Sequence, residues 1–471
     1  MQSYRDIAVM MRWQIEPRSS QREALDSKAL LSLEPVSGNN LADPKTAQFL
    51  ALKSSIHRKL LDRINLAMLD KLSRAQIEAE VGEIVLGLLA QEDEALNAKE
   101  RNQLVDEVLD ELLGLGPLEP LLADDTITDI LVNGFNTVFV ERRGLLERVP
   151  TRFQDERHLL RIIQKIVSAV GRRVDESSPF VDARLADGSR VNAIVAPLAI
   201  DGSLLSVRKF SRKRIGIERL VELGSMPAEV AEVLSAIVAS RRNVLISGGT
   251  GSGKTTLLNA MSAFIDGRER IVTIEDSAEL QLQQDHVARL ETRPANLEGR
   301  GEVSQRDLVK NALRMRPDRI IIGEVRAGEA FDMLQAMNTG HDGSMTTVHA
   351  NTPRDALARV EQMIGMSGVE ISATSARAQI ASAIHVVVQI GRQADGRRRL
   401  LSLSEVVGME GPLITMQEIF RFKVTGRGEG GEVLGQFEAT GVRPRFLRAA
   451  GEAGIELPSD YFRPGAAMGQ S

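Results

Sequence analysis

Cysteine is absent from all 471 residues of the sequence, and aromatic side chains make up only 3% of it. Without cysteine there are no disulfides, thiolate metal sites or cysteine nucleophiles, a composition that suits a reducing compartment. Because aromatic residues are few, the hydrophobic cores must consist mainly of Leu, Ile, Val and Ala. The same scarcity argues against the aromatic platforms on which single-stranded nucleic acids stack.

Long apolar segments are also missing. The longest apolar run, Ile84–Ala90, is far shorter than the roughly 18 residues that a membrane span requires. The N-terminus is polar, and its apolar run Ile7–Met11 is too short for the core of a secretion signal. With 59 Lys and Arg against 64 Asp and Glu, the net charge of −5 does not favour general nucleic-acid binding. We therefore expect a soluble, cytoplasmic protein.

The length predicts two or three domains. Residues 1–50 mix Pro, Ser, Asn and charges without a period, and we expect a poorly ordered segment there. From 51 to 114, apolar residues such as Ile56 and Leu60 recur at helical spacing, which predicts a small three-helix bundle. Residues 115–212 combine short alternating runs with one helical segment, the pattern of an α+β domain.

A basic run at 208–214 follows this α+β pattern, and we interpret it as a linker. Residues 213–425 then alternate buried strands with helices, as in a parallel α/β core. The expected strands are Val244–Ser247, Arg270–Ile274, Arg319–Ile322, Thr346–His349 and His385–Ile390. Residues 426–471 begin with a glycine-rich turn and are expected to form a C-terminal tail that docks back on the core.

The first of these strands leads into a phosphate-binding loop. Gly248, Gly253, Lys254 and Thr255 satisfy the spacing G-x-x-x-x-G-K-[ST] between a buried strand and a helix. Glycines allow positive φ, so that successive N–H groups surround a phosphate, and the helix N-terminus adds its positive end. Lys254 is expected to reach the β- and γ-phosphates, and Thr255 to bind Mg²⁺. The nucleotide-binding residues predicted here are Gly248, Gly249, Thr250, Gly251, Ser252, Gly253, Lys254, Thr255 and Thr256.

Ionisable side chains follow three further strands of the core. Glu275, Glu324 and His349 each stand at a strand's carboxyl end, where open α/β sheets bind their ligands. Phosphate hydrolysis needs a carboxylate to orient water, a Mg²⁺ and cations for the developing charge. Glu324, whose strand we expect beside the phosphate-loop strand, is the first candidate for activating water, with Glu275 second, and either could contact Mg²⁺. His349 is placed to sense a γ-phosphate, whereas His341 lies on a glycine-flanked loop.

Four blocks together resemble the secretion-superfamily ATPases, the hexameric motors of type II and type IV secretion, type IV pili and archaella. They are Gly248–Thr256, Ile274–Leu282, Arg319–Glu329 and Gly340–Asn351, similar to a Walker A, an Asp box, a Walker B and a His box. The sequence is most similar to the Tad/CpaF branch, which assembles Flp pili. The strings that carry this likeness are Ile127–Gly134, Val174–Pro179, Asp182–Arg190 and Leu313–Asp318.

The resemblance implies a RecA-like core, preceded by a PAS-like α+β domain, that hydrolyses ATP with Mg²⁺. It implies Lys254 and Thr255 as nucleotide and Mg²⁺ contacts, Glu275 and Glu324 as the box acids, and His341 with His349 as the His box. It further implies that three arginines of the preceding domain approach the phosphates, within or between subunits: Arg184, Arg190 and Arg208. Gly323 precedes Glu324 where a Walker B usually has Asp, which leaves the roles of Glu275 and Glu324 open.

The resemblance also implies partners. A homo-hexamer at the cytoplasmic face of the inner membrane would act on platform proteins of a pilus or secretion machine, without direct nucleic-acid binding. Since the chain has no cysteine, it cannot carry the tetracysteine zinc insert common in type II secretion and type IVa pilus ATPases. The alternatives are a type IV secretion ATPase, a nucleic-acid motor, which only the basic run at 208–214 favours, and a non-hydrolysing nucleotide switch.

Overall fold

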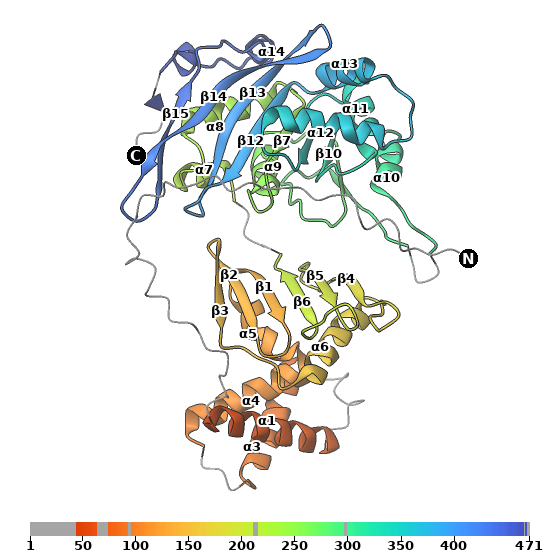
Figure 1. Cartoon of the computed structure of the whole chain (residues 1–471), viewed down its shortest axis with the longest axis vertical. Helices are drawn as coiled ribbons and strands as arrows, with labels where there is room; N and C mark the ends of the chain where they lie inside the picture. Colours follow the sequence, from red (N-terminus) through yellow and green to blue (C-terminus); the bar gives the residue numbers. More distant parts are fainter. Residues whose placement is uncertain are drawn as a thin grey trace, which may run out of the picture.

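The computed structural model describes residues 44–63, 74–92, 96–210, 215–295, 299–465 and 467–468. These residues form a helical bundle, a six-stranded sheet and a larger helix-covered sheet, arranged along the long axis of the molecule (Figure 1). Most of the segment expected to be poorly ordered, residues 1–43, lies outside the described residues, as do residues 211–214 of the basic run. No helix in the described part is both long and apolar enough to span a membrane.

The bundle is held by an aliphatic core. Its helices are α1 (Pro44–Arg63), α3 (Arg74–Leu89) and α4 (Ala98–Leu113). Ile56, Leu60, Val85 and Leu104 are buried between them, as the helical spacing of these residues requires. Asn97 begins α4 with a capping box. The first helix starts at Pro44, before residue 51, where the bundle was expected to begin.

The middle part is an antiparallel sheet with the strand order β3-β2-β1-β6-β5-β4. Its elements are η1 (Gly116–Leu118), α5 (Glu119–Ala123), β1 (Ile127–Asn133), β2 (Val138–Arg142), β3 (Leu145–Val149), α6 (Glu156–Ala169), β4 (Phe180–Arg184), β5 (Arg190–Ile194) and β6 (Leu204–Arg208). Leu159, Ile163 and Ile166 of α6 pack in one core with Ile130 and Val132 of the sheet. Helix α6 therefore covers one face of this α+β domain.

The third part is built on a ten-stranded sheet, ordered β16-β15-β14-β13-β12-β7-β11-β10-β8-β9 among the described residues. The strands from β12 to β9 run parallel, and β13, β14 and β15 continue the sheet antiparallel. Their bounds are β7 (Val244–Ser247), β8 (Ile271–Glu275), β9 (Val287–Glu291), β10 (Arg319–Ile322), β11 (Met345–Val348), β12 (Val386–Arg392), β13 (Arg398–Glu410), β14 (Leu413–Arg427), β15 (Val433–Ala439) and β16 (Ala467–Met468).

Helices cover both faces of this sheet. Val244 and Ile246 of β7 pack with one helix layer, and Leu245 between them packs with the other, because side chains alternate along a strand. The first layer holds α7 (Ile217–Glu222), α8 (Ala228–Ala239), α9 (Lys254–Ser262) and α14 (Phe446–Glu452), with η2 (Ser459–Phe462) beside it. The second holds α10 (Gln305–Ala312), α11 (Glu329–Asn338), α12 (Pro353–Gly365) and α13 (Ala373–Ala383). The predicted α/β class is confirmed.

The strand order corrects one expectation. Glu324 follows β10, which we expected to neighbour the phosphate-loop strand β7. Instead β11 lies between them, pairing with β7 on one side and β10 on the other. His349, at the end of β11, therefore stands between the phosphate loop and Glu324.

The C-terminal residues also differ from the expected tail. Strand β14 crosses the boundary expected at residue 425. The whole of β15 pairs with the second half of β14. Buried Glu405 of β13 accepts the N–H groups of Arg445 and Phe446, both at 2.7 Å, and so anchors the start of α14. The predicted turn at Gly426–Gly431 is thus a connection inside the large sheet.

Candidate nucleotide site

The phosphate loop joins β7 to α9. Gly251 and Gly253 have φ values of 68° and 95°, the left-handed region that favours glycine. At Gly248 a Cβ would lie 2.4 Å from the carbonyl oxygen of Ile390, so only glycine fits against the neighbouring strand β12. Helix α9 begins at Lys254, with Gly253 as its N-cap. The loop therefore has the glycine-dependent conformation that the sequence predicted, followed by a helix N-terminus.

The Lys254 side chain is buried and lies back over this loop. Its Nζ donates to the carbonyl oxygens of Gly248 and Gly249, at 3.1 and 3.0 Å. The ring of His349 is also close, with Nε2 at 3.3 Å from the same Nζ. Burial lowers the pKa of Lys254, and the charge of Glu324 opposes this effect. An anion in the loop would supply the counter-charge that a buried ammonium otherwise lacks.

His349 connects Lys254 to Glu324. The Nε2 atom of His349 lies 2.9 Å from Oε1 of Glu324, whose Oε2 accepts from Nη2 of Arg326 at 2.9 Å. Arg326 in turn lies 3.4 Å from Asp276. Burial and the charge of Lys254 lower the pKa of His349, which favours its neutral form. The structure thus brings together three residues that the sequence singled out from three separate strand ends.

Glu275 occupies a different environment from Glu324. Its side chain is only 3% exposed, and burial raises its pKa to about 7. Oε2 accepts the N–H groups of Glu279 and Leu280 at 2.7 and 2.9 Å, whereas Oε1 is buried without a hydrogen-bond partner. A Cβ at Gly323 would lie 3.0 Å from Cγ of Glu275. Gly323 therefore stands where a larger residue would press on this carboxyl group.

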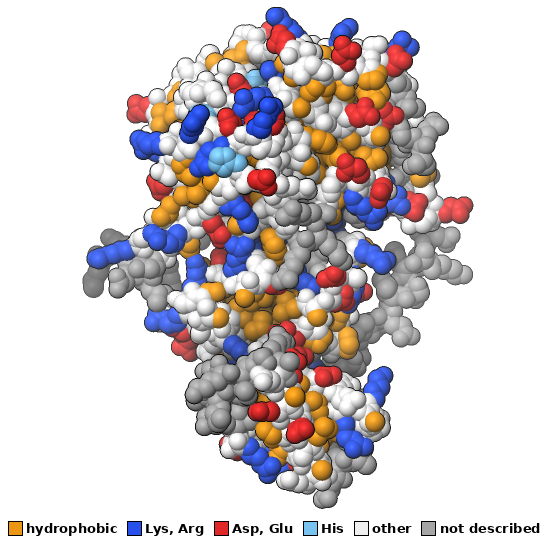
Figure 2. Space-filling view, turned by 180° about the vertical axis from the view of Figure 1, so that it is seen from behind, with side chains coloured by type: hydrophobic (Ala, Val, Ile, Leu, Met, Phe, Trp, Pro, Cys, Tyr) orange, Lys and Arg blue, Asp and Glu red, His pale blue; other side chains and the backbone are white. Residues whose placement is uncertain are grey.

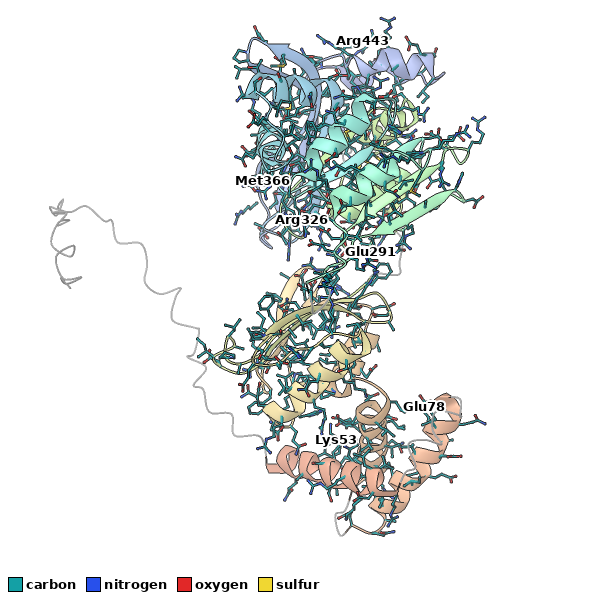
Figure 3. The ribbon with its side chains drawn as sticks, turned by 90° about the vertical axis from the view of Figure 1, so that its right-hand side faces the viewer. Lys53, Glu78, Glu291, Arg326, Met366 and Arg443 are labelled. Atoms are coloured by element: carbon teal, nitrogen blue, oxygen red, sulfur yellow. The ribbon has the colours of Figure 1, made fainter. Side chains whose placement is uncertain are left out.

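Two of the three predicted arginines reach across to the loop that follows Glu275. Arg184 pairs with Glu291 at 2.9 Å and donates to the carbonyl oxygen of Ala278 at 2.8 Å. Arg190 pairs with Glu279 at 3.0 Å and donates to the carbonyl oxygen of Ser277 at 3.1 Å. In Figure 3, Glu291 and Arg326 lie on the side of the upper domain that faces the α+β domain.

Arg208 remains in its own domain, where it pairs with Asp129 at 3.1 Å. It nevertheless lines a cavity of about 210 Å³ between the two domains, together with Arg190 and with Thr255 and Thr256 of α9. Figure 2 shows Lys and Arg side chains at the level where the two domains meet. All three arginines are thus near the domain junction, and Arg184 and Arg190 donate hydrogen bonds to the core.

His341 does not join the site. It precedes β11, whereas His349 follows it, so the two histidines lie at opposite ends of this strand. The adjoining Gly343 and Ser344 donate to Oδ1 of Asn243, the residue before β7, at 2.8 and 3.0 Å. His341 is therefore far from its own phosphate loop, and the prediction of His341 as a nucleotide contact is not supported by this arrangement.

Two arginines that the sequence reasoning missed lie beside the phosphate loop. Nε of Arg398 donates to the carbonyl oxygen of Gly251 at 2.8 Å. A Cβ at Gly251 would lie 3.8 Å from Nη1 of Arg392. Both belong to the β12–β13 hairpin, and the turn pair Asp395-Gly396 was the signal that could have revealed it.

The residues present fit a nucleotide with Mg²⁺. The buried Oε1 of Glu275 is an oxygen without a partner, and carboxylate oxygens are ligands that Mg²⁺ prefers. Thr255, at the start of α9, lines the adjoining cavity. Among the described residues no cluster of three His, Asp or Glu forms a metal site by itself. A Mg²⁺ ion held here would depend on phosphate oxygens as well, as is usual for this ion.

Comparisons with known proteins show the family to which the chain belongs. The family model described as type II/IV secretion system protein matches residues 111–415. The chain is 41% identical over 307 residues to a putative conjugal transfer protein, Rv3659c, of Mycobacterium tuberculosis, covering 64% of this chain and 87% of that protein. It is 34% identical over 297 residues to the conjugal transfer protein TrbB of Rhizobium radiobacter, covering 62% and 86%. The crystal structure of the VirB11 ATPase from the Brucella suis type IV secretion system, in complex with sulphate, aligns at 27% identity with a TM-score of 0.33, covering 61% and 95%.

Proposed function

Because this chain belongs to the type II/IV secretion system protein family and is an ATP-hydrolysing enzyme, we propose that it is the ring motor of a pilus machine. Its helix-covered sheet with a phosphate loop is the RecA-like core that the resemblance implied. The observation that carries the proposal is the convergence of Lys254, His349 and Glu324 beside a junction that arginines of the preceding domain cross. A site completed by a second domain suits a motor, because hydrolysis and domain movement then affect the same contacts.

Glu324 is the residue that orients the attacking water in this proposal. It lies beside His349, which contacts Lys254, so its carboxylate is at the end of the loop where a γ-phosphate belongs. Glu275 is more deeply buried and would hold Mg²⁺, directly or through water, together with Thr255. A bound Mg²⁺ would neutralise phosphate charge and would favour the ionised form of Glu275.

Arg190 and Arg184 supply positive charge near the phosphates. Each pairs with a carboxylate and donates to a carbonyl oxygen of the ATPase domain, on the side of the junction where Glu275 lies. An always-charged planar guanidinium suits phosphate oxygens. A homo-hexamer in which the two domains move would let the arginines leave these partners for the nucleotide of the same or a neighbouring subunit.

The machine that we propose is a Flp (Tad-type) pilus, served from the cytoplasmic face of the inner membrane through platform proteins. This choice rests on the strings at 127–134, 174–179, 182–190 and 313–318, and on the absence of cysteine. The second candidate is a type IV secretion system, favoured by the relatives whose names refer to conjugal transfer.

Lys254→Ala tests the nucleotide site, with exposed Lys310→Ala on α10 as a matched control. We expect Lys254→Ala to lose ATP binding and hydrolysis and Lys310→Ala to keep both. Retained full turnover in the Lys254 variant would refute the site.

The roles of the two acids are separated by Glu324→Gln and Glu275→Gln. The first should still bind ATP with Mg²⁺ but turn over at least about 100-fold more slowly, since it loses the water-orienting carboxylate. The second should lose the Mg²⁺-dependent part of the affinity. Equal losses of Mg²⁺-dependent affinity in both variants would contradict this division.

The two candidate machines are distinguished in the source cells. Deletion of the gene, complemented with wild type or with Lys254→Ala, should abolish surface pili in all but the wild-type complement. If pili persist and transfer of DNA or protein fails instead, the type IV secretion candidate replaces the pilus.

A further inference from the structure

Two pairs of like charges face each other across the domain junction. In the β12–β13 hairpin, Arg392 is directly opposite Arg398. In the α+β domain, Asp129 of β1 is directly opposite Glu141 of β2. Like charges directly opposite each other in antiparallel strands are destabilising. Each pair therefore needs opposite charge from elsewhere, and the two pairs are complementary.

Glu141 provides the contact between them. Its two carboxylate oxygens lie 3.8 Å from Nη1 of Arg392 and 3.9 Å from Nη2 of Arg398. The Glu141 side chain is 18% exposed, while Asp129 is occupied by Arg208. A single carboxylate thus faces two guanidinium groups, at distances beyond hydrogen-bond reach, which leaves positive charge uncompensated at this point.

That positive charge lies on the rim of the phosphate loop. Nε of Arg398 donates a hydrogen bond to the carbonyl oxygen of Gly251, and the Arg392 guanidinium lies beside the same glycine. The strand and turn around Glu141 are close as well, because a Cβ at Gly144 would lie 3.1 Å from Nη2 of Arg392. The loop, the hairpin and the β2–β3 turn therefore form one continuous contact between the two domains.

We propose that Arg392 and Arg398 are further phosphate-facing cations of the nucleotide site, and that Glu141 is a positioning residue that holds them when no nucleotide is bound. The inference rests on the proposed function, since it assumes that the loop binds nucleotide phosphate. The phosphates compete with Glu141 for the two guanidinium groups, and their binding weakens the contact that joins the domains. By linkage, a domain movement that separates Glu141 from the hairpin raises nucleotide affinity by the same factor.

The test measures the dissociation constant of a non-hydrolysable ATP analogue and of AMP for single variants. Glu141→Gln removes the competing carboxylate, and we expect analogue affinity to rise about two- to fivefold, the range of a partly exposed ion pair. Arg398→Gln loses charge and the bond to Gly251, and its affinity should fall roughly tenfold. Both effects should be smaller for AMP, which carries less phosphate charge. The Glu141 effect should vanish when both arginines are replaced by Gln.

Matched controls lie a few residues away. Glu147→Gln removes an acid of β3 that pairs with Arg142 in its own domain, and Arg397→Gln removes a half-exposed arginine of the hairpin turn that pairs with Glu432. Both should bind the analogue as wild type does. An unchanged or lowered affinity in Glu141→Gln would overturn the inference, since a purely structural role for Glu141 gives no gain. Failure of the wild type itself to bind ATP would instead refute the proposed function.

A second readout follows the domains directly. Because the chain has no cysteine, Arg148→Cys on β3 and Glu429→Cys near β14 can be spin-labelled selectively. The analogue should lengthen or broaden the distance distribution between the labels, and Glu141→Gln should produce part of that change without nucleotide. A distribution that neither nucleotide nor the substitution alters would contradict the coupling.

Discussion

Glu275 is expected to make the stability of the ATPase domain depend on pH. Burial raises its pKa from 4.5 to about 7. Between these two values the folded state binds more protons than the unfolded state, so stability falls as pH rises. The contribution is fully present below 4.5 and is lost above about 7. Since the side chain is only 3% exposed, solvent screening does not reduce this effect.

The magnitude follows from the size of the shift. One pKa unit corresponds to about 1.4 kcal/mol, so the wild type should lose on the order of 2 to 3 kcal/mol between pH 5 and pH 8 from this carboxyl group. Glu275→Gln cannot ionise and keeps an oxygen for the N–H groups of Glu279 and Leu280. Its buried amide carries an unsatisfied donor, but that cost is the same at both pH values. The free energy of unfolding of the variant, relative to that of the wild type, should therefore increase as the pH rises.

The assay is thermal unfolding of both proteins at pH 5 and pH 8, without nucleotide or Mg²⁺, followed by circular dichroism. For a domain of this size, 1 kcal/mol corresponds to roughly 2 to 4 °C. The Tm difference, variant minus wild type, should hence grow by about 4 to 12 °C from pH 5 to pH 8. Glu269→Gln would serve poorly as a control because Glu269 binds buried Arg319, so exposed Glu370→Gln is the better choice. A Tm difference that does not vary with pH would refute a raised pKa at Glu275.

Four further variants address the neighbouring contacts. Gly323→Ala should lower turnover about tenfold, and the free energy of unfolding measured without Mg²⁺ should fall by about 1 to 3 kcal/mol, because the added Cβ would displace the Glu275 carboxyl group. Turnover at the wild-type rate would contradict the close packing. His349→Ala should weaken ATP binding or hydrolysis, whereas His341→Ala should leave both unchanged in the isolated subunit; an equal loss would place His341 in the site after all. Asn243→Ala leaves the N–H groups of Gly343 and Ser344 unpaired and should cost about 2 to 4 kcal/mol of stability without changing the nucleotide dissociation constant, as measured by unfolding and by titration.

The local parts of the site were predictable because local rules control them. The glycine spacing of the phosphate loop reports positive φ at Gly251 and Gly253, and the structure has those values. His349 and Glu324 were both expected at the carboxyl ends of parallel strands, and the structure has them there, after β11 and β10. The position of His341 before β11 follows from a strand that the sequence already indicated.

Strand order and strand pairing were not predictable in the same way. The position of β11 between β7 and β10 depends on which buried faces pack together, and burial does not distinguish these strands because all three are buried along their whole length. The long hairpin of β13 and β14 mixes exposed and buried positions irregularly, with bulges that interrupt its alternation. Its pairing was therefore missed. The neighbouring pairing of β12 with β13 was missed as well, and with it the two arginines beside the loop.

The sequence by itself determined the glycine-dependent conformation of the loop after β7 and the acids that follow parallel strands of the core, because backbone conformation and strand ends are local properties. Only the tertiary structure decided which charges meet. The contacts of Arg190 with Glu279, of His349 with Glu324, and of Glu141 with Arg392 join residues far apart in the chain. Such pairings depend on how two domains and a ten-stranded sheet pack, and no spacing within the sequence encodes them.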